Sequence, residues 1–186
     1  MAISWAGSAS ALLINGVEVG YVDALLGETN DLSENPSGSC GTGGPGLSGG
    51  GSSPKAELCW INNVLSALGK DTTSYFEKTE DQGYLYDDDS GLIGFELSSP
   101  TEYFMLKNST WWGLFQNTSS YDWAVINTGL ISAGSKLPGD GTEKDPFMIS
   151  HVAAVGDIVK VPEPGTLALL GLGLAGLGLR RRLMKF

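Results

Sequence analysis

Arginine is absent from residues 1–161, and basic residues of any kind are scarce there. This part of the chain holds 7 lysines against 20 aspartate and glutamate residues, which gives a formal charge of −13. Proteins that bind nucleic acid need many cationic contacts with phosphate groups. The composition therefore argues against nucleic acid as a partner and indicates an acidic protein with enough aliphatic and aromatic residues for a packed core.

Histidine and cysteine are also scarce. The chain has one histidine, His151, and two cysteines, Cys40 and Cys59, without the spacing of a zinc site. The motifs G-x-S-x-G and H-E-x-x-H are absent as well. We therefore expect a protein that is not an enzyme and that holds no cofactor, and we place His151 on the outer face of a strand.

The two cysteines flank a loop rich in glycine, serine and proline. Two free buried thiols are one interpretation, and a disulfide between Cys40 and Cys59 is the one we prefer for an exported protein. Closing such a loop stabilises a fold by about 3 kcal/mol in the chain-entropy model. Within residues 38–51, eight of fourteen positions are glycine, so we expect no regular structure there.

One segment, at about residues 54–68, has the pattern of an α-helix. Ser53 suits the N-cap, Pro54 suits the first helical position, and Glu57 suits the first turn. Gly69 stands where a helix commonly ends. We expect one apolar face of this helix to pack on a sheet. Its residues recur at helical spacing and are Leu58, Ile61, Leu65 and Leu68.

The rest of residues 12–160 has the pattern of short strands separated by turns. The runs are rich in aromatic and β-branched residues and alternate with clusters of Asp, Asn, Ser, Gly and Pro. Strands at near-regular spacing are typical of a sandwich. The sequence therefore predicts a mainly β, secreted domain: an antiparallel β-sandwich or jelly-roll-like fold with one packed helix.

Two turns carry clusters of carboxylates. Asp87, Asp88 and Asp89 form one, and the other contains Asp140, Glu143 and Asp145. Calcium prefers several oxygen ligands, so Asp87, Asp88 and Asp89 are weak candidates for a calcium site. The spacing required for an EF-hand loop is not met, and a solvated acidic turn is the preferred interpretation.

Aromatic residues gather in the second half of the domain. Trp111, Trp112 and Trp123 could stack on sugar rings if their faces lie on the surface, which makes a carbohydrate-binding module an alternative function. Packing in the core is the other interpretation. Because adjacent strand residues point to opposite faces, at most one of Trp111 and Trp112 faces the core, and the other is exposed or covered.

The C-terminal 26 residues differ from the rest of the chain. Residues 171–176 spell G-x-G-x-x-G, but Pro162 and Pro164 precede this run where a nucleotide site needs a strand. Residues 165–179 carry no charge and would span about 22 Å as a helix, against roughly 30 Å for the hydrocarbon core of a bilayer. This length indicates a short transmembrane helix suited to temporary anchoring.

The tail resembles the PEP-CTERM sorting signal of Gram-negative bacteria. The resemblance rests on the order of its three parts: Pro-Glu-Pro, an apolar run, and a terminal basic cluster. The residues that carry it are Val161, Pro162, Glu163, Pro164, Gly165 and Thr166, followed by Arg180, Arg181 and Arg182. The resemblance implies processing near Pro-Glu-Pro by exosortase, a membrane transpeptidase. It also implies delivery to the cell surface or extracellular matrix, often alongside exopolysaccharide production.

The predicted organisation has three parts. Residues 1–11, which include small residues similar to a signal-peptidase site, are interpreted as the remnant of a signal peptide. Residues 12–160 form the β-rich domain, and residues 161–186 form the sorting signal, which holds the chain transiently at the inner membrane. We expect a structural or adhesive protein of exopolysaccharide or biofilm material. A secreted hydrolase, the least favoured alternative, would require two acids facing each other across a cleft.

Overall fold

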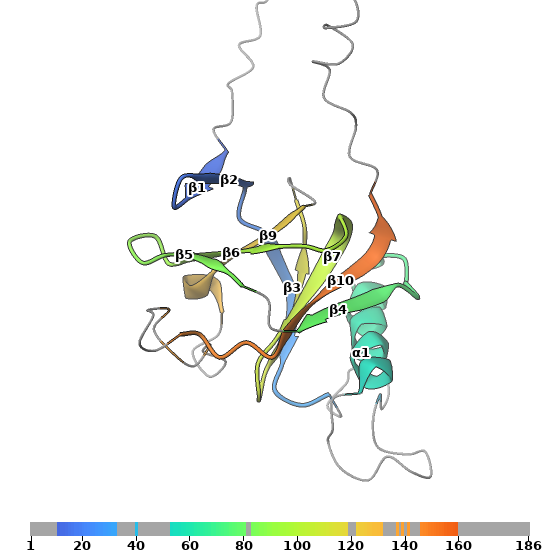
Figure 1. The fold of residues 1–186 in the computed structure, drawn as a ribbon. Helices are drawn as coiled ribbons and strands as arrows, with labels where there is room; N and C mark the ends of the chain where they lie inside the picture. Colours follow the sequence, from blue (N-terminus) through green and yellow to red (C-terminus); the bar gives the residue numbers. More distant parts are fainter. Residues whose placement is uncertain are drawn as a thin grey trace, which may run out of the picture.

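The computed structural model describes residues 11–32, 40, 53–80, 83–118, 122–131, 137, 139, 141 and 146–159. These residues form ten strands, one α-helix and one turn of 3-10 helix at Thr128–Leu130 (Figure 1). The helix is α1 (Pro54–Ala67). The strands are β1 (Leu12–Ile14), β2 (Val17–Gly20), β3 (Ala24–Thr29), β4 (Phe76–Glu80), β5 (Leu85–Asp87), β6 (Leu92–Glu96), β7 (Thr101–Lys107), β8 (Trp112–Gln116), β9 (Trp123–Asn127) and β10 (His151–Ile158).

The strands form three antiparallel sheets, so the prediction of a mainly β fold with one helix is confirmed. The largest sheet has the order β3-β8-β7-β10-β4, a second has the order β5-β6-β9, and β1 and β2 form a hairpin. Strand β10, the last strand of the described residues, lies inside the large sheet between β7 and β4. The last strand of the described residues therefore has a hydrogen-bonded neighbour on each side.

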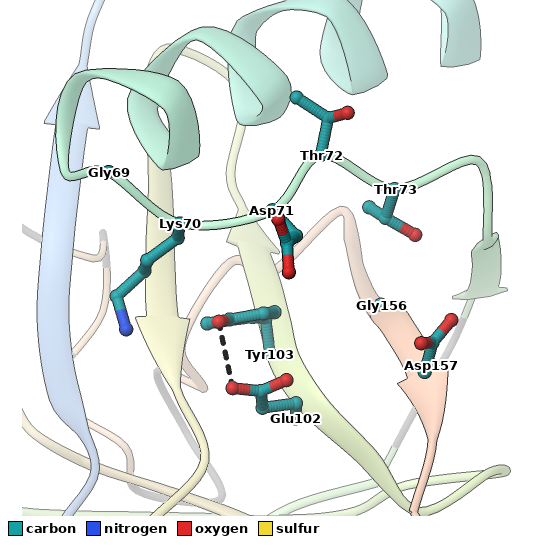
Figure 2. A pocket seen from close by; sticks show the side chains of 9 residues that line it. All are labelled: Gly69, Lys70, Asp71, Thr72, Thr73, Glu102, Tyr103, Gly156 and Asp157. Atoms are coloured by element: carbon teal, nitrogen blue, oxygen red, sulfur yellow. Dashed lines mark hydrogen bonds between the residues drawn. The ribbon is translucent and has the colours of Figure 1, made fainter.

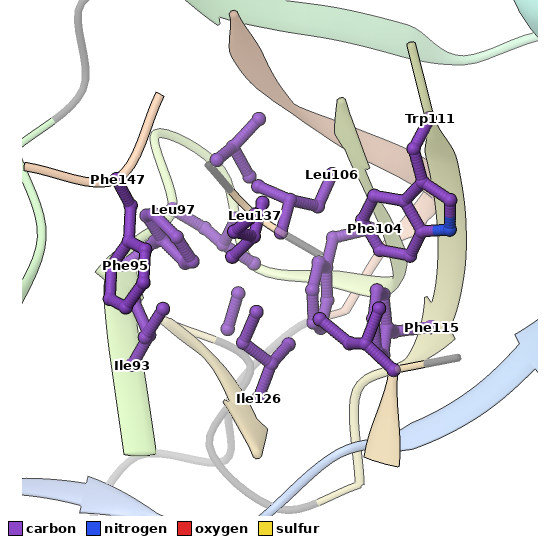
Figure 3. Packing of buried hydrophobic residues seen from close by; sticks show 13 residues of the cluster. Ile93, Phe95, Leu97, Phe104, Leu106, Trp111, Phe115, Ile126, Leu137 and Phe147 are labelled. Carbon is purple, nitrogen blue, oxygen red and sulfur yellow. The ribbon is translucent and has the colours of Figure 1, made fainter. Parts of the chain in front are cut away.

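Alternating residues of β7 and β8 build two separate cores. Phe104 and Leu106 of β7 point into a core between the large sheet and the three-stranded sheet, where Phe95 and Ile126 meet them (Figure 3). Met105 of β7 points to the opposite face, where α1 covers the large sheet. This period of two is what an antiparallel sheet buried on both faces requires.

The predicted helix at 54–68 is confirmed, and its ends follow local rules. The Ser53 hydroxyl accepts a hydrogen bond from the backbone N–H of Ala56 at 3.2 Å, which caps the first turn. Gly69 follows the helix with φ of +68°, a backbone conformation that favours glycine. Residue 68 is the C-cap, so the regular helix ends one residue before the predicted limit.

The buried face of α1 differs in part from the predicted one. Ile61 and Leu65 are buried as expected, whereas Leu68 is about half exposed. Trp60 and the carboxylate-bearing Glu57 lie on the buried face in its place. The face is therefore shifted toward the N-terminal half of the helix, where Trp60 supplies more apolar surface than a leucine would.

The cysteines are joined. Cys40 and Cys59 form a disulfide that links α1 to the segment preceding it, so the preferred pairing is confirmed. The side-chain amide of Asn63, one turn further along α1, donates a hydrogen bond to Sγ of Cys40 at 2.9 Å.

Several predicted features lie outside the described residues. They are residues 1–10 of the predicted leader remnant, the glycine-rich loop 38–51 apart from Cys40, the acidic residues Asp140, Glu143 and Asp145, and the whole sorting tail with its apolar run. Within the part of the chain that is described, no helix has the length and apolar character needed to cross a bilayer.

Candidate functional site

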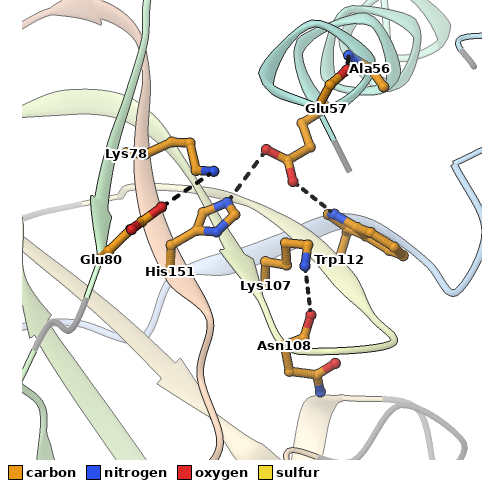
Figure 4. Close-up of polar contacts among 9 residues, drawn as sticks. Ala56, Glu57, Lys78, Glu80, Lys107, Asn108, Trp112 and His151 are labelled. Carbon is orange, nitrogen blue, oxygen red and sulfur yellow. Dashed lines mark hydrogen bonds and ion pairs between the residues drawn. The ribbon is translucent and has the colours of Figure 1, made fainter. Parts of the chain in front are cut away.

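A buried polar cluster lies between α1 and the large sheet (Figure 4). It contains Glu57 of α1, Lys107 of β7, Trp112 of β8 and His151 of β10, and is called the Glu57 cluster below. The indole N–H of Trp112 donates to Oε1 of Glu57 at 3.3 Å, and Nε2 of His151 lies 3.4 Å from Oε2 of Glu57. The carboxylate therefore joins the helix to two strands of the sheet.

Lys107 completes the cluster. Its ammonium group donates to the backbone carbonyl of Asn108 at 3.1 Å and lies 5.1 Å from the centre of the Trp112 ring. Burial lowers the pKa of Lys107, attraction to Glu57 opposes this effect, and repulsion from Lys78 adds to it, so the pKa lies below its usual range. A partly desolvated lysine is tolerated here because an aromatic face and a carboxylate are close.

The charge of Glu57 is stabilised by its neighbours. Burial raises the pKa of its carboxyl, but the contacts with His151, the Trp112 N–H and the charge of Lys78 outweigh burial. The net result is a pKa below the usual range of a glutamate. At neutral pH the side chain is therefore a carboxylate held beneath the helix.

His151 does not lie on an outer strand face, so that expectation is wrong. Its side chain is 4% exposed and that of Glu57 is 0% exposed. The Nε2 atom of His151 faces the Glu57 carboxylate, whose Oε2 is 3.4 Å away. A substrate would reach this pair only after movement of α1, so the geometry supports a role in positioning the helix.

The tryptophans do not form a surface for stacking on sugars. Trp111 packs in the core between the sheets, with its ring edge against Phe115 and its N–H donating to Glu28 at 3.0 Å. Trp112 points to the other face of the sheet, where α1 covers it. Trp123 is half-buried against the β1–β2 hairpin. Burial of Trp111 and Trp112 thus corrects the prediction that these side chains are candidates for glycan stacking.

Of the aspartates of the calcium candidate, Asp87 ends β5, and Asp88 and Asp89 lie in the turn that leads to β6. The Asp87 carboxylate accepts hydrogen bonds from the Asp89 backbone N–H at 3.2 Å and from the Ser90 hydroxyl at 2.7 Å. These bonds shape the turn from within. Among the described residues, no three His, Cys, Asp or Glu side chains are grouped so that they could hold a metal ion.

A polar pocket of about 300 Å³ lies at the C-terminal end of α1 (Figure 2). Its floor is Tyr103, whose hydroxyl donates to Glu102 at 2.8 Å and whose ring lies 5.5 Å from the ammonium group of Lys70. Burial and the Glu102 carboxylate raise the pKa of Tyr103 to about 12. The remaining side chains around the pocket are Asp71, Thr72, Thr73 and Asp157.

This polar pocket was not predicted from the sequence. Its residues come from three segments that are far apart in the chain, namely the loop after α1, the start of β7 and the end of β10. Their spacing carries no motif, and only the pairing of β7 with β10 brings Glu102 and Asp157 to one place. Long-range contacts of this kind leave no local signal.

A second pocket, of about 330 Å³, is more aromatic. The rings of Tyr86 and Phe147 meet edge to face there with centres 4.9 Å apart, and the Tyr86 hydroxyl donates to Asp88 at 3.3 Å. Asp88 thus lines a pocket beside an aromatic pair. Among the described residues, it has no further acidic, histidine or cysteine side chains grouped with it to bind a metal ion.

The described fold ends where the tail begins. The backbone N–H of Val159, one residue beyond β10, donates to the carbonyl of Pro100 at 2.9 Å. The described chain is thus a mainly antiparallel β domain in which β10, an interior strand of the large sheet, immediately precedes the tail in the sequence. The family model of the PEP-CTERM protein-sorting motif matches residues 160–182, so the predicted resemblance is confirmed. The motif supports an exported protein that is sorted and processed by exosortase.

The other two comparisons give no match. Neither the curated proteins nor the solved structures contain a chain that matches this one. The motif therefore describes the tail, and the function of residues 12–159 must be inferred from their own chemistry.

Proposed function

We propose that this protein is a structural or adhesive, non-enzymatic component of the cell surface or extracellular matrix, within exopolysaccharide or biofilm material. The observation that carries the proposal is the match of residues 160–182 to the sorting motif. In this proposal the tail directs the chain to exosortase, and the folded domain is the part delivered to the cell surface or matrix. Pro162, Glu163 and Pro164 are recognised by that enzyme and removed or exposed by its action.

Two properties of the folded domain support delivery outside the cytoplasm. Disulfides persist in oxidising compartments, and Cys40 and Cys59 are paired. The arginine-free, acidic composition of residues 1–161 gives a surface that stays soluble and repels other copies. Both properties suit a protein that works in a hydrated matrix.

The membrane step belongs to the same proposal. Residues 165–179 are uncharged, and Arg180, Arg181 and Arg182 follow them. Basic residues flanking an apolar run favour the cytoplasmic side of a membrane. The run would hold the chain at the inner membrane until exosortase releases the domain. Its short length suits an anchor that is temporary.

The test is the mature C-terminus of the protein isolated from its own host. Mass spectrometry is expected to find an end near residues 162–166, with the leucine- and glycine-rich run absent. Glu163→Gln and Pro164→Ala are expected to accumulate the unprocessed chain, because they alter the recognised motif. Gly173→Ala is the matched control, since it changes the apolar run without touching Pro-Glu-Pro. An intact Phe186 on a cytoplasmic wild-type protein would overturn the proposal.

Carbohydrate binding is a second candidate, now favoured by the polar pocket in place of the tryptophans. Carboxylates and hydroxyls such as those of Asp71, Thr72 and Asp157 are suited to hydroxyl-rich molecules. Calorimetric titration with neutral and amino-bearing oligosaccharides tests this function. Binding that is lost in Asp157→Asn and retained in Asp87→Asn would support it, whereas absence of heat with either class would remove it.

A further inference from the structure

The pairing and the burial of strand β10 both decrease after Gly156. From His151 to Val155 it is paired on both sides, with β4 on one and β7 on the other, and these residues are buried. Gly156 is the last buried residue, and its φ of +92° is a conformation that favours glycine. The register with β7 shifts between Val155 and Ile158, so the strand bulges at this glycine.

The three residues that follow are held much less firmly. In the described part of the chain, the pairing with β4 ends at Val155, and the N–H of Gly156 donates a last, long hydrogen bond of 3.4 Å to Tyr75 on that side. Beyond Gly156, the pairing that remains is with β7. Ile158 lies opposite Thr101, and the N–H of Val159 donates to Pro100. The Asp157 side chain is exposed, and that of Ile158 is 56% exposed. Few buried contacts and one-sided pairing mark a segment that opens locally at low cost.

This weakly held segment is adjacent to the sorting motif. Pro162 follows Val159 by three residues, so even a fully extended chain separates them by no more than about 11 Å. An enzyme that acts on a peptide bond binds the chain in an extended form and needs several residues free on each side of it. With Val159 still bonded to Pro100, only residues 160 and 161 separate the hydrogen-bonded backbone from Pro162.

We propose that Asp157–Val159 leave the large sheet and are bound by the sorting transpeptidase as the N-terminal part of its substrate segment. This inference rests on the proposed function. Gly156 is the hinge, because its backbone already departs from the strand geometry. Release frees the backbone N–H and C=O groups of the three residues to pair with a strand edge in the enzyme, and it presents Asp157 and Ile158 as side chains for recognition. Residues 151–155, paired on both sides, keep the domain folded.

A cross-strand disulfide tests the release directly. Thr101 and Ile158 are direct partners in an antiparallel pair, a position at which the Cα separation suits a disulfide. The variant Thr101→Cys/Ile158→Cys, with the new bond verified by peptide mass mapping, is expected to lose processing in the host and to accumulate as the full-length chain. Each single substitution is the matched control and is expected to be processed like the wild type.

A flexible spacer inserted after Val159 distinguishes loss of processing caused by the cross-strand disulfide from loss caused by misfolding. Inserting about ten Gly and Ser residues after Val159 supplies a free extended segment without release of β10. The same double-cysteine variant with this spacer is expected to be processed again. Processing of the locked variant without a spacer would overturn the inference, and so would failure of the spacer to restore it. If the wild type itself is not processed, the proposed function fails, and this outcome is recognised from the wild-type arm alone.

Discussion

Oε2 of Glu57 in α1 lies 3.4 Å from Nε2 of His151 at the start of β10, and both side chains are buried. The two residues come from elements that are distant in the sequence, and their contact places the N-terminal half of the helix on β10, an interior strand of the large sheet. The indole N–H of Trp112 bonds the other carboxylate oxygen. One carboxylate therefore fixes the position of α1 on the large sheet, and removing it is expected to cost stability.

Glu57→Ala should destabilise the domain by about 3 kcal/mol, because it leaves the Trp112 N–H and His151 buried without their partner. Glu57→Gln keeps an acceptor for Trp112 and removes only the charge, so about 1 kcal/mol is expected. Urea unfolding followed by tryptophan fluorescence measures both free energies. Equal losses in the two variants would show that the hydrogen bond from Trp112 contributes nothing.

The same carboxylate predicts a dependence on acid. The pKa of Glu57 in the folded protein lies below that in the unfolded chain. Its contribution to stability is therefore fully present above the unfolded pKa and is lost as the pH falls through the folded one. Unfolding free energies measured from pH 6 to pH 3 should fall more steeply for the wild type than for Glu57→Gln. Parallel curves would contradict the assignment.

Asp23, between β2 and β3, predicts the opposite dependence. Its carboxylate accepts hydrogen bonds from the backbone N–H groups of Val125 at 2.7 Å and Thr118 at 2.8 Å. Burial raises its pKa from 3.8 to about 6, although the bonds from Val125 and Thr118 lower it. The favourable contribution is therefore present below pH 3.8 and is lost as the pH rises through about 6.

The size of this effect follows from the shift. A rise of about two pKa units corresponds to roughly 3 kcal/mol between the two protonation states. Asp23→Asn has no carboxyl group at this position to titrate, so residue 23 should add no pH dependence to the stability of the variant. The wild type should lose stability between pH 4 and pH 6. Thermal unfolding across that range compares the two. A wild type whose stability is flat there, after correction for Glu57, would disprove the raised pKa.

Local patterns predicted the elements of the fold but not their partners. Ser53, Pro54 and Gly69 mark the ends of α1 because capping depends on neighbouring residues alone. The Pro-Glu-Pro motif is equally local, and its identity was predicted from the sequence. The position of His151 was not, because it depends on which strand face α1 covers.

The tryptophans illustrate the same limit. Alternation along an extended chain predicted that Trp111, just before β8, and Trp112, its first residue, point to opposite faces, and they do. It could not predict that both faces are buried, since one is covered by the three-stranded sheet and the other by the helix. The polar pocket escaped prediction for a related reason: the pairing of β7 with β10 creates it, and strand order has no local signature.

Gly113 in β8 is expected to tolerate no side chain. A Cβ at this position would lie 2.4 Å from the Trp111 ring and 2.9 Å from that of Phe115, both in the core between the sheets. Gly113→Ala should therefore destabilise the domain by about 3 kcal/mol, at the upper end of what overpacking costs. Gly83→Ala is the matched control, since a Cβ there meets nothing within 4 Å. Similar thermal midpoints for the two variants would contradict this packing.

The disulfide should matter most for the N-terminal side of α1. Cys40 and Cys59 are 19 residues apart, and opening a loop of this length is expected to cost about 3 kcal/mol. Reduction, or the variant Cys40→Ala/Cys59→Ala, should lower the urea midpoint of the purified domain by corresponding amounts. Reductant should have no effect on the double variant, which makes that variant the control. An unchanged wild-type midpoint under reductant, with mass mapping showing the bond to be broken, would contradict a stabilising role of the disulfide.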